Sequence, residues 1–199
     1  MTKKSNEVSI NTGFGEDQRE TVARLFWSAF KGKLGLVMNP EAKAIQFFAS
    51  VADPTHAISA TRADGTLIGV AGFKTQSGSF IGGELKDLQT IYGWFGGLWR
   101  GLILSVLERP LADNTLLMDG IMVSDSARGQ GVGTDLLSAV KRVAASLNCS
   151  QVRLDVIDIN PRARALYERQ GFVAKQTNGI GPLRFIFGFR TSTTMVCEL

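Results

Sequence analysis

The sequence predicts an α/β fold with a mixed, mostly antiparallel central sheet that is flanked by helices. Three observations predict it. Segments with the 3.6-residue apolar period of helices alternate with short apolar runs that are typical of strands. A strand–helix–strand unit over residues 116–159 indicates one parallel pair, and hairpin patterns lie on either side of it. No repeat, low-complexity tract or linker interrupts the 199 residues, so we expect a single domain over residues 1–199.

Composition and charge narrow the classes of protein. Apolar residues make up 44% and charged residues 20% of the chain, as in ordinary globular proteins. The net charge of +4 is scattered along the chain, which favours an anionic ligand but not nucleic acid. Cys149 and Cys197 stand in no cluster typical of a disulfide framework or a metal site. Because the first residues lack the apolar run of a secretory signal, we expect a cytoplasmic protein with free thiols.

Two helices are expected near the start of the chain. Apolar residues spaced i, i+3, i+4 and i+7 predict an amphipathic helix over residues 16–31. A second helix is expected from Pro40 to about Val51, because proline is tolerated at the first helical position.

A hairpin follows these helices. Residues 56–61 and 66–75 are expected to form two strands around a turn at residues 63–65. His56, the only histidine of the chain, stands at the start of the first strand. We interpret it as a turn or surface residue and not as a catalytic base.

An insert over residues 85–111 precedes the next strand. Its apolar stripe from Leu88 to Val106 predicts a helix. The apolar segment from Ile91 to Leu107 is too short for a membrane span and carries Arg100 near its middle. A second stripe consists of small residues: Gly93, Gly97, Gly101 and Ser105. These glycines predict close helix packing, or a break near Gly96-Gly97. The insert is a candidate for core packing, for a wall of an acceptor pocket or for a dimer surface.

The second half of the chain alternates strands and helices. Asn160 and Pro161 are expected to begin the last helix and Gly171 to end it. The expected elements are a strand over 116–123, a helix ending near Asn148, a strand over 151–159, this last helix, and strands over about 172–177 and 183–197.

The segment SARGQGVGTDLL, residues 126–137, connects a buried strand to a helix through alternating glycines. Such a junction exposes backbone N–H groups at a helix N-terminus and is typical of phosphate binding. A P-loop is excluded because Gly133 is followed by Thr134 and not by lysine. A dinucleotide-binding GxGxxG pattern fails as well, because neither possible register ends on glycine.

Two motifs together carry a family resemblance. Residues 128–133 read RxxGxG after the strand, and NPRARALYERQGF, residues 160–172, matches the pattern NxxAxxLYxxxGF. This resembles the GCN5-related N-acetyltransferase (GNAT) superfamily over about residues 119–177. The resemblance implies a GNAT-like single domain, with the helical insert before the central cofactor-binding strand. It also implies acetyl-CoA as co-substrate, and no metal.

The resemblance also implies roles for individual residues. The strand residues Ile121, Met122 and Val123 would pair with the pantetheine arm of coenzyme A. The loop that would cradle the pyrophosphate comprises Arg128, Gly129, Gln130, Gly131, Val132, Gly133 and Thr134. Asn160, Ala163 and Tyr167 would contact the cofactor. Tyr167 would protonate the leaving thiolate, since a phenol with a pKa of about 10 stays protonated.

The resemblance predicts transfer of an acetyl group from acetyl-CoA to a primary amine of a small molecule or peptide, by direct attack in a ternary complex. Asp119, on the central strand, is the first candidate for the base that deprotonates the amine, and Glu84 is the second. Two alternatives remain open: a non-catalytic acyl-CoA-binding or interaction domain, and an acyltransferase that uses a longer acyl-CoA. A homodimer is possible.

Overall fold

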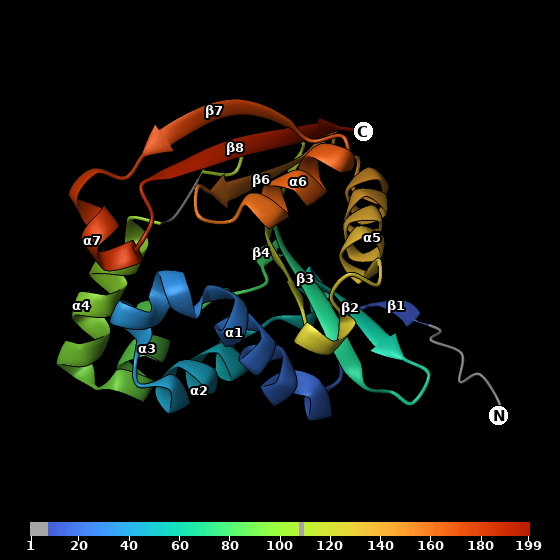
Figure 1. Ribbon diagram of the computed structural model, residues 1–199. Helices are drawn as coiled ribbons and strands as arrows, with labels where there is room; N and C mark the ends of the chain where they lie inside the picture. Colours follow the sequence, from blue (N-terminus) through green and yellow to red (C-terminus); the bar gives the residue numbers. More distant parts are fainter. Residues whose placement is uncertain (1–7, 108–109) are drawn as a thin grey trace.

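The computed structural model describes residues 8–107 and 110–199. Residues 1–7 and 108–109, and with them the start of the chain and part of the expected insert, lie outside the described residues. The centre of the molecule is an eight-stranded sheet in the order β1-β2-β3-β5-β6-β8-β7, with β4 paired to β3 (Figure 1).

The first half of the described chain contains these elements: β1 (Val8–Thr12), a 3-10 turn (Glu16–Gln18), α1 (Arg19–Met38), α2 (Glu41–Val51), a 3-10 turn (Pro54–His56), β2 (Ala57–Arg62), β3 (Leu67–Thr75), β4 (Gly78–Ser79), α3 (Leu85–Tyr92) and α4 (Trp94–Ser105). The second half contains β5 (Thr115–Val123), a 3-10 turn (Asp125–Ala127), α5 (Val132–Ser146), β6 (Gln151–Ile157), α6 (Pro161–Arg169), β7 (Val173–Gly179), a 3-10 turn (Gly181–Leu183), α7 (Arg184–Phe187) and β8 (Thr191–Glu198).

The sheet is mixed, as the sequence predicts. β5 and β6 are parallel, because α5 connects them as a crossover. Every other strand pair of the sheet in the described residues is antiparallel. The α/β fold class is thereby confirmed.

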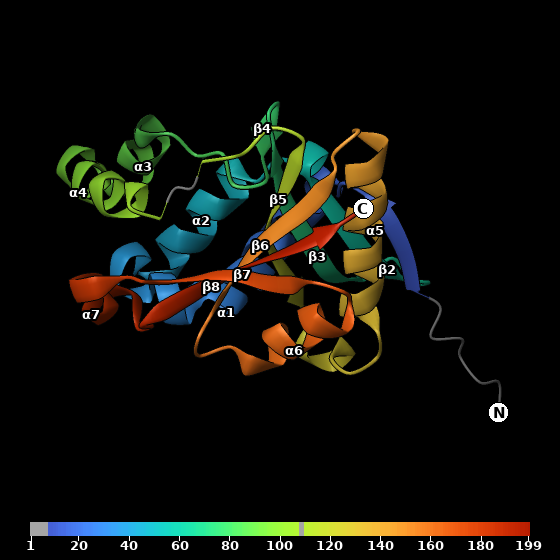
Figure 2. The ribbon, with the colours of Figure 1, turned by 90° about the horizontal axis from the view of Figure 1, so that it is seen from above.

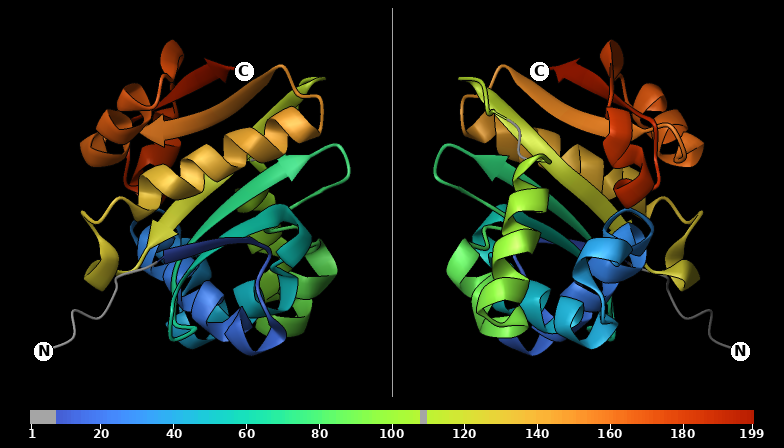
Figure 3. Two further views of the ribbon diagram at one scale, coloured as in Figure 1. Left: turned by 90° about the vertical axis from the view of Figure 1, so that its right-hand side faces the viewer. Right: turned by 90° about the vertical axis from the view of Figure 1, so that its left-hand side faces the viewer.

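Two apolar clusters cover the two faces of the sheet. One lies beneath α1 and α2 and includes Phe26, Phe48 and Met122. The other lies beneath α5 and includes Leu136, Val140 and Leu154. Figures 2 and 3 show α5 on one side of the sheet and α1 and α2 on the other. Binding sites therefore have to open along the edges between these layers.

The first helix is longer than the sequence pattern predicts. It continues past residue 31 to Met38, although Gly32 and Gly35 lie within it. Leu34, Val37 and Met38 are almost fully buried, and their burial outweighs the roughly 1 kcal/mol that each helical glycine costs. The expected end at residue 31 was therefore wrong.

The sequence pattern did not predict β1 and β4, and the last expected strand begins later than predicted. β1 pairs with β2, and the two-residue β4 pairs with β3. The strand expected over 183–197 is replaced in its first part by α7, which ends at Gly188 with φ +70°. Phe187 and Phe189 on either side of that glycine are buried, so the chain folds back into the core before β8 begins.

The insert forms two helices and not one. The chain turns at Gly93, whose φ is +78°, three residues before the predicted break. α4 then packs closely on α3, since a Cβ at Gly97 would lie 2.5 Å from the backbone nitrogen of Gln89. The prediction that the glycines serve close helix packing is confirmed. Within the described residues, none of the helices has both the length and the hydropathy to cross a bilayer.

Candidate active site

The loop between β5 and α5 holds two glycines in backbone conformations that other residues rarely adopt. Gly129 and Gly131 have φ angles of +78° and +87°, which cost an L-residue about 1–2 kcal/mol. A Cβ at either position would meet no atom within 4 Å. The backbone conformation, and not a crowded neighbour, therefore requires glycine here.

Backbone N–H groups of this loop and of the first turn of α5 have no protein partner. Among the described residues, no hydrogen bond uses the N–H groups of residues 129–133. Together with the helix dipole they place partial positive charge at this point. Arg128 lies beside them and forms an exposed ion pair of 2.8 Å with Asp125. The junction can bind phosphate groups through its backbone.

The central strand β5 contains a bulge at Asp119. Gly72 of β3 pairs with Gly120, and its neighbour Phe73 pairs with Met118. Asp119 is therefore an extra residue without a partner on β3. A bulge of this kind bends the strand and increases its twist.

The bulge changes which face of the sheet each side chain occupies. Leu116 and Met118 before it, and Ile121 and Val123 after it, all contact the cluster beside α5. In an uninterrupted strand, odd and even positions lie on opposite faces. Alternation alone does not establish which face of the sheet carries the Asp119 side chain. The pairing with β3 does, because it shows that Asp119 is the extra residue.

β5 and β6 separate after Leu117, just before the bulge. Their ladder consists of three pairs, Thr115–Leu117 with Gln151–Arg153, whereas β6 remains paired with β8 as far as Ile157. One backbone edge of residues 118–123 therefore has no partner strand in the described part of the chain. An extended ligand can pair with such an edge as an additional strand. The predicted residues Ile121, Met122 and Val123 lie on this segment.

Helix α6 lies against the start of α5. Asn160 Oδ1 accepts a hydrogen bond of 3.1 Å from the N–H group of Ala163, so the predicted N-cap is confirmed. A Cβ at Gly133 would lie 3.3 Å from Leu166 of α6. The contact brings α6 next to the N–H groups of the glycine loop.

Tyr167 of α6 is buried beside Phe172, with 6.0 Å between the ring centroids. No described residue makes a hydrogen bond to its hydroxyl group. Burial raises the pKa of the Tyr167 phenol to about 12, because the charged phenolate is poorly solvated there. The group stays protonated at neutral pH and can act as a proton donor.

A cavity of about 870 Å³ opens on the other face of the sheet, between α1–α4 and the strands β5 and β6. Asp119 lines it. Solvent reaches the Asp119 carboxyl through the cavity, yet protein surrounds it on most sides, and this desolvation raises its pKa to about 6. Lys74 and His56 oppose the rise only in part. A carboxyl group with this pKa is ionised at neutral pH and suits a general base.

Two further carboxyl groups line the cavity, and both have protein partners. Glu84 forms an exposed ion pair of 3.0 Å with Lys86. Asp155 accepts a hydrogen bond from Thr194. Glu84, the second candidate base, thus lies at the cavity, but its carboxylate is already engaged by Lys86.

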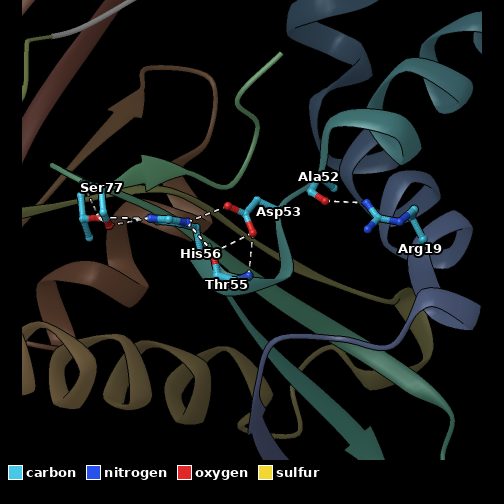
Figure 4. A network of polar contacts seen from close by, with 7 residues as sticks. Arg19, Ala52, Asp53, Thr55, His56 and Ser77 are labelled. Carbon is cyan, nitrogen blue, oxygen red and sulfur yellow. Dashed lines mark hydrogen bonds and ion pairs between the residues drawn. The ribbon is translucent and has the colours of Figure 1, made fainter. Parts of the chain in front are cut away.

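His56 is the last residue of the 3-10 turn Pro54–His56, so its interpretation as a turn residue is confirmed, but it is buried and not on the surface. Figure 4 shows its ring between two polar groups. Nδ1 lies 2.9 Å from Asp53 Oδ2, and Nε2 lies 3.1 Å from Thr75 Oγ1. The N–H group of Asp53 also donates to the carbonyl oxygen of Phe80. The network therefore fastens the segment around Phe80, which forms part of the cavity wall.

Sequence reasoning missed this network, although one signal was present. Asp53 precedes Pro54 and caps the short turn by accepting from the N–H group of Thr55 at 2.8 Å. Asp followed by Pro is a known start signal for helical turns. The contact of His56 with Thr75 depends on tertiary structure and left no such signal.

The predicted site residues fall into two groups. The glycine loop, Ile121, Val123 and α6 lie together on the face covered by α5, whereas the Met122 side chain packs on the opposite face. Asp119 lies with α1–α4 at the cavity, and Tyr167 is not part of that lining. The described residues contain no group of three or more His, Cys, Asp or Glu side chains that could hold a metal ion.

Sequence comparisons identify relatives of this chain. The family model "Acetyltransferase (GNAT) family" matches residues 19–172. The thialysine N-epsilon-acetyltransferase of Bos taurus is 41% identical over 56 residues, and that of Mus musculus is 43% identical over 71 residues. These segments cover 28% and 36% of this chain, and 33% and 41% of the relatives. The chain thus matches less than half of the length of either relative.

Solved structures share the fold. A GCN5-related N-acetyltransferase from Kribbella flavida has a TM-score of 0.63 at 16% identity, and an N-acetyltransferase from Staphylococcus aureus Mu50 has 0.64 at 14%. Both comparisons cover 96% of this chain and 98% of the other. Since the family model spans most of the chain and these structures share its fold, the protein belongs to the acetyltransferase (GNAT) family.

Proposed function

We propose that the protein transfers an acetyl group from acetyl-CoA to a primary amine of a small molecule or peptide in a ternary complex. One observation carries this proposal: within the described part of the chain, the N–H groups of residues 129–133 have no protein partner, and they follow directly on a segment of β5 with one unpaired edge. Family membership and the partial similarity to enzymes named for acetylating thialysine support it.

The residues of one face fit an acyl donor with a diphosphate and an extended arm. The N–H groups from Gly129 to Gly133, together with Thr134 and Arg128, would hold the diphosphate. The backbone of residues 121–123 would pair with the amides of the arm. Asn160, Ala163 and Tyr167 of the neighbouring α6 would contact it from the side.

Two side chains would move the protons. Asp119 would take the proton of the ammonium group, which leaves a neutral amine to attack the acetyl carbonyl carbon. The carbon–nitrogen bond forms as the carbon–sulfur bond breaks, and Tyr167 would donate its proton to the departing sulfur. The surplus proton on the new amide nitrogen would pass to water, and the Tyr167 phenolate would regain a proton from water. Much of the rate acceleration would come from holding the amine nitrogen close to the acetyl carbonyl carbon in the correct orientation.

The first experiment is calorimetry with coenzyme A, followed by a thiol-release assay with acetyl-CoA and a panel of amines. The variant Tyr167→Phe then separates an enzyme from a binding domain. We expect its kcat to fall about tenfold to 100-fold while the Kd for coenzyme A changes less than twofold. The variant keeps the aromatic ring and lacks only the hydroxyl group that would donate the proton.

The chain offers a matched control, since Tyr92 is its only other tyrosine. Tyr92 is also buried, but its hydroxyl donates to the carbonyl oxygen of Met38 on the opposite face. Tyr92→Phe should lower thermal stability and leave turnover unchanged. If Tyr167→Phe retains full turnover, the phenol is not the acid; if no coenzyme A binds, the proposed function itself is wrong.

A further inference from the structure

The cavity beside Asp119 is mainly apolar. Of its 26 lining residues, 15 are leucine, isoleucine, methionine or phenylalanine. Three leucines of the insert are unusually exposed for their size: Leu85 at 43%, Leu98 at 44% and Leu102 at 73%. Exposed leucines around a cavity are typical of a site that buries them against a ligand.

The size of the cavity limits the ligand. Its volume of about 870 Å³ lies within the range of about 300–1,000 Å³ of sites for drug-sized molecules. A methyl group or a short amine alone would leave most of the leucine surface in water.

The charges favour a cationic ligand. Three carboxyl groups and two ammonium groups line the cavity: Asp119, Glu84, Asp155, Lys33 and Lys74. Glu84 and Asp155 are engaged by Lys86 and Thr194. Lys74, His56 and the backbone at Phe80 stabilise the Asp119 carboxylate in part, but among the described residues no side chain donates a hydrogen bond to it, so it can receive a cation from outside.

We infer that the acceptor is a primary amine carried on a bulky apolar body, which lies against Leu98 and Leu102 while its ammonium group meets Asp119. The inference rests on the proposed function and names its substrate class. Leu98 and Leu102 are specificity-determining residues, because they gain contact only when the acceptor is long enough to reach them.

A long acyl chain on the donor is the competing occupant. It would fill the apolar part of the cavity but would offer Asp119 no cation. Burying a carboxylate against a hydrocarbon chain is unfavourable. The charged end of the cavity therefore favours the amine.

The test is a series of straight-chain amines from butylamine to octylamine with acetyl-CoA, measured by thiol release. These amines have almost the same basicity, so differences in kcat/KM report apolar contact. We expect a rise of up to about fourfold per methylene, and about tenfold to 100-fold over the series. Phenethylamine should exceed lysine and thialysine.

Two variants of α4 are compared, one inside the cavity lining and one outside it. Leu98→Ser with Leu102→Ser removes exposed leucines that line the cavity. Phe95→Ser removes a side chain of the same helix that is 79% exposed but outside the lining. The double variant should reduce the rise over the amine series at least tenfold, and Phe95→Ser should leave it intact.

Each contrary outcome has a distinct meaning. A flat amine series, or a rise that depends on acyl-CoA length and not on amine length, overturns the inference, and so does an equal effect of Phe95→Ser. Efficient acetylation of lysine and thialysine alone overturns the inference but not the proposed function. Failure to release thiol with every amine overturns both.

Discussion

The two faces of the sheet contribute to the candidate site in different ways. On the face of α5 and α6, the proposed recognition would depend on the backbone: N–H groups of residues 129–133 and the edge of β5 that has no partner strand in the described part of the chain. On the face of α1–α4, it would depend on side chains that surround a cavity, with Asp119 among its charged residues. The first face carries both sequence motifs, and the second carries none.

The difference follows from what each kind of site requires of the sequence. A backbone site needs glycines and caps at fixed spacing, so it leaves a pattern such as RxxGxG. A side-chain cavity needs only volume and polarity, which many residues from distant segments can provide. The proposed donor site can therefore be predicted from sequence motifs, whereas the proposed acceptor site is found only in the structure.

The largest expected effect tests the cavity face. Asp119→Asn keeps the shape of the side chain but cannot take a proton at neutral pH. We expect kcat/KM to fall about 100-fold to 10,000-fold, measured by thiol release at pH 8. Glu84→Gln, at the same cavity, is the control and should stay within about threefold of the wild type. If Glu84→Gln shows the larger loss, Glu84 is the base.

The next effect tests the backbone face. Gly131→Ala forces a Cβ onto a residue with φ +87° and should cost about 1–2 kcal/mol of folding stability. Gly65→Ala is matched, since Gly65 has φ +81° and equally open surroundings in the β2–β3 turn. Both variants should lose stability in urea denaturation, but only Gly131→Ala should weaken coenzyme A binding, by about tenfold. Equal affinities would remove the loop from the donor site.

A smaller effect is expected in the pH dependence of stability. The fold raises the pKa of Asp119 to about 6, above its value in the unfolded chain. Ionisation is thus disfavoured in the folded state, and stability is lost as pH rises from about 4 through 6. Asp119→Asn should therefore be more stable than the wild type at pH 8, by about 1 kcal/mol, since solvent in the cavity screens part of the penalty. The two proteins should be equally stable near pH 4; a constant difference would point to another cause.

The smallest effect separates two roles of Asn160. Asn160→Asp keeps an oxygen that accepts from the Ala163 N–H group, so the free energy of unfolding should change by less than about 0.5 kcal/mol. A contact between the Asn160 amide and the donor would be lost, which should raise the KM for acetyl-CoA about threefold. An unchanged KM would leave Asn160 as a helix cap alone.

Much of the fold could be predicted from the sequence, because local rules determine it. The cap at Asn160, the hairpin of β2 and β3 and the parallel pair across α5 each follow from a local pattern. α7 could not be predicted, because two apolar residues such as Phe187 and Phe189 can be buried from a helix or from a strand. The sequence pattern therefore does not distinguish the two. β1 shows the same limit, because it exists only through its pairing with β2.

The site was predictable to the extent that it depends on spacing. The motifs placed the glycine loop and α6 side by side, as the contact of Gly133 with Leu166 shows. The position of Asp119 depends on a bulge that one strand cannot reveal, since the extra residue is defined by the register of β3. The burial of His56 depends on Thr75 and Ser77, about 20 residues away.

The short ladder between β5 and β6 has a consequence for the lifetime of the protein. Three residue pairs join the two halves of the sheet, and a donor lying along β5 would bridge the remainder. Ligand that binds only the folded form at 100 times its Kd adds about 2.7 kcal/mol of resistance to unfolding. If the proposed function holds, proteases would degrade the protein fastest when its acyl donor is scarce, and the supply of donor would regulate the amount of protein as well as its rate of turnover.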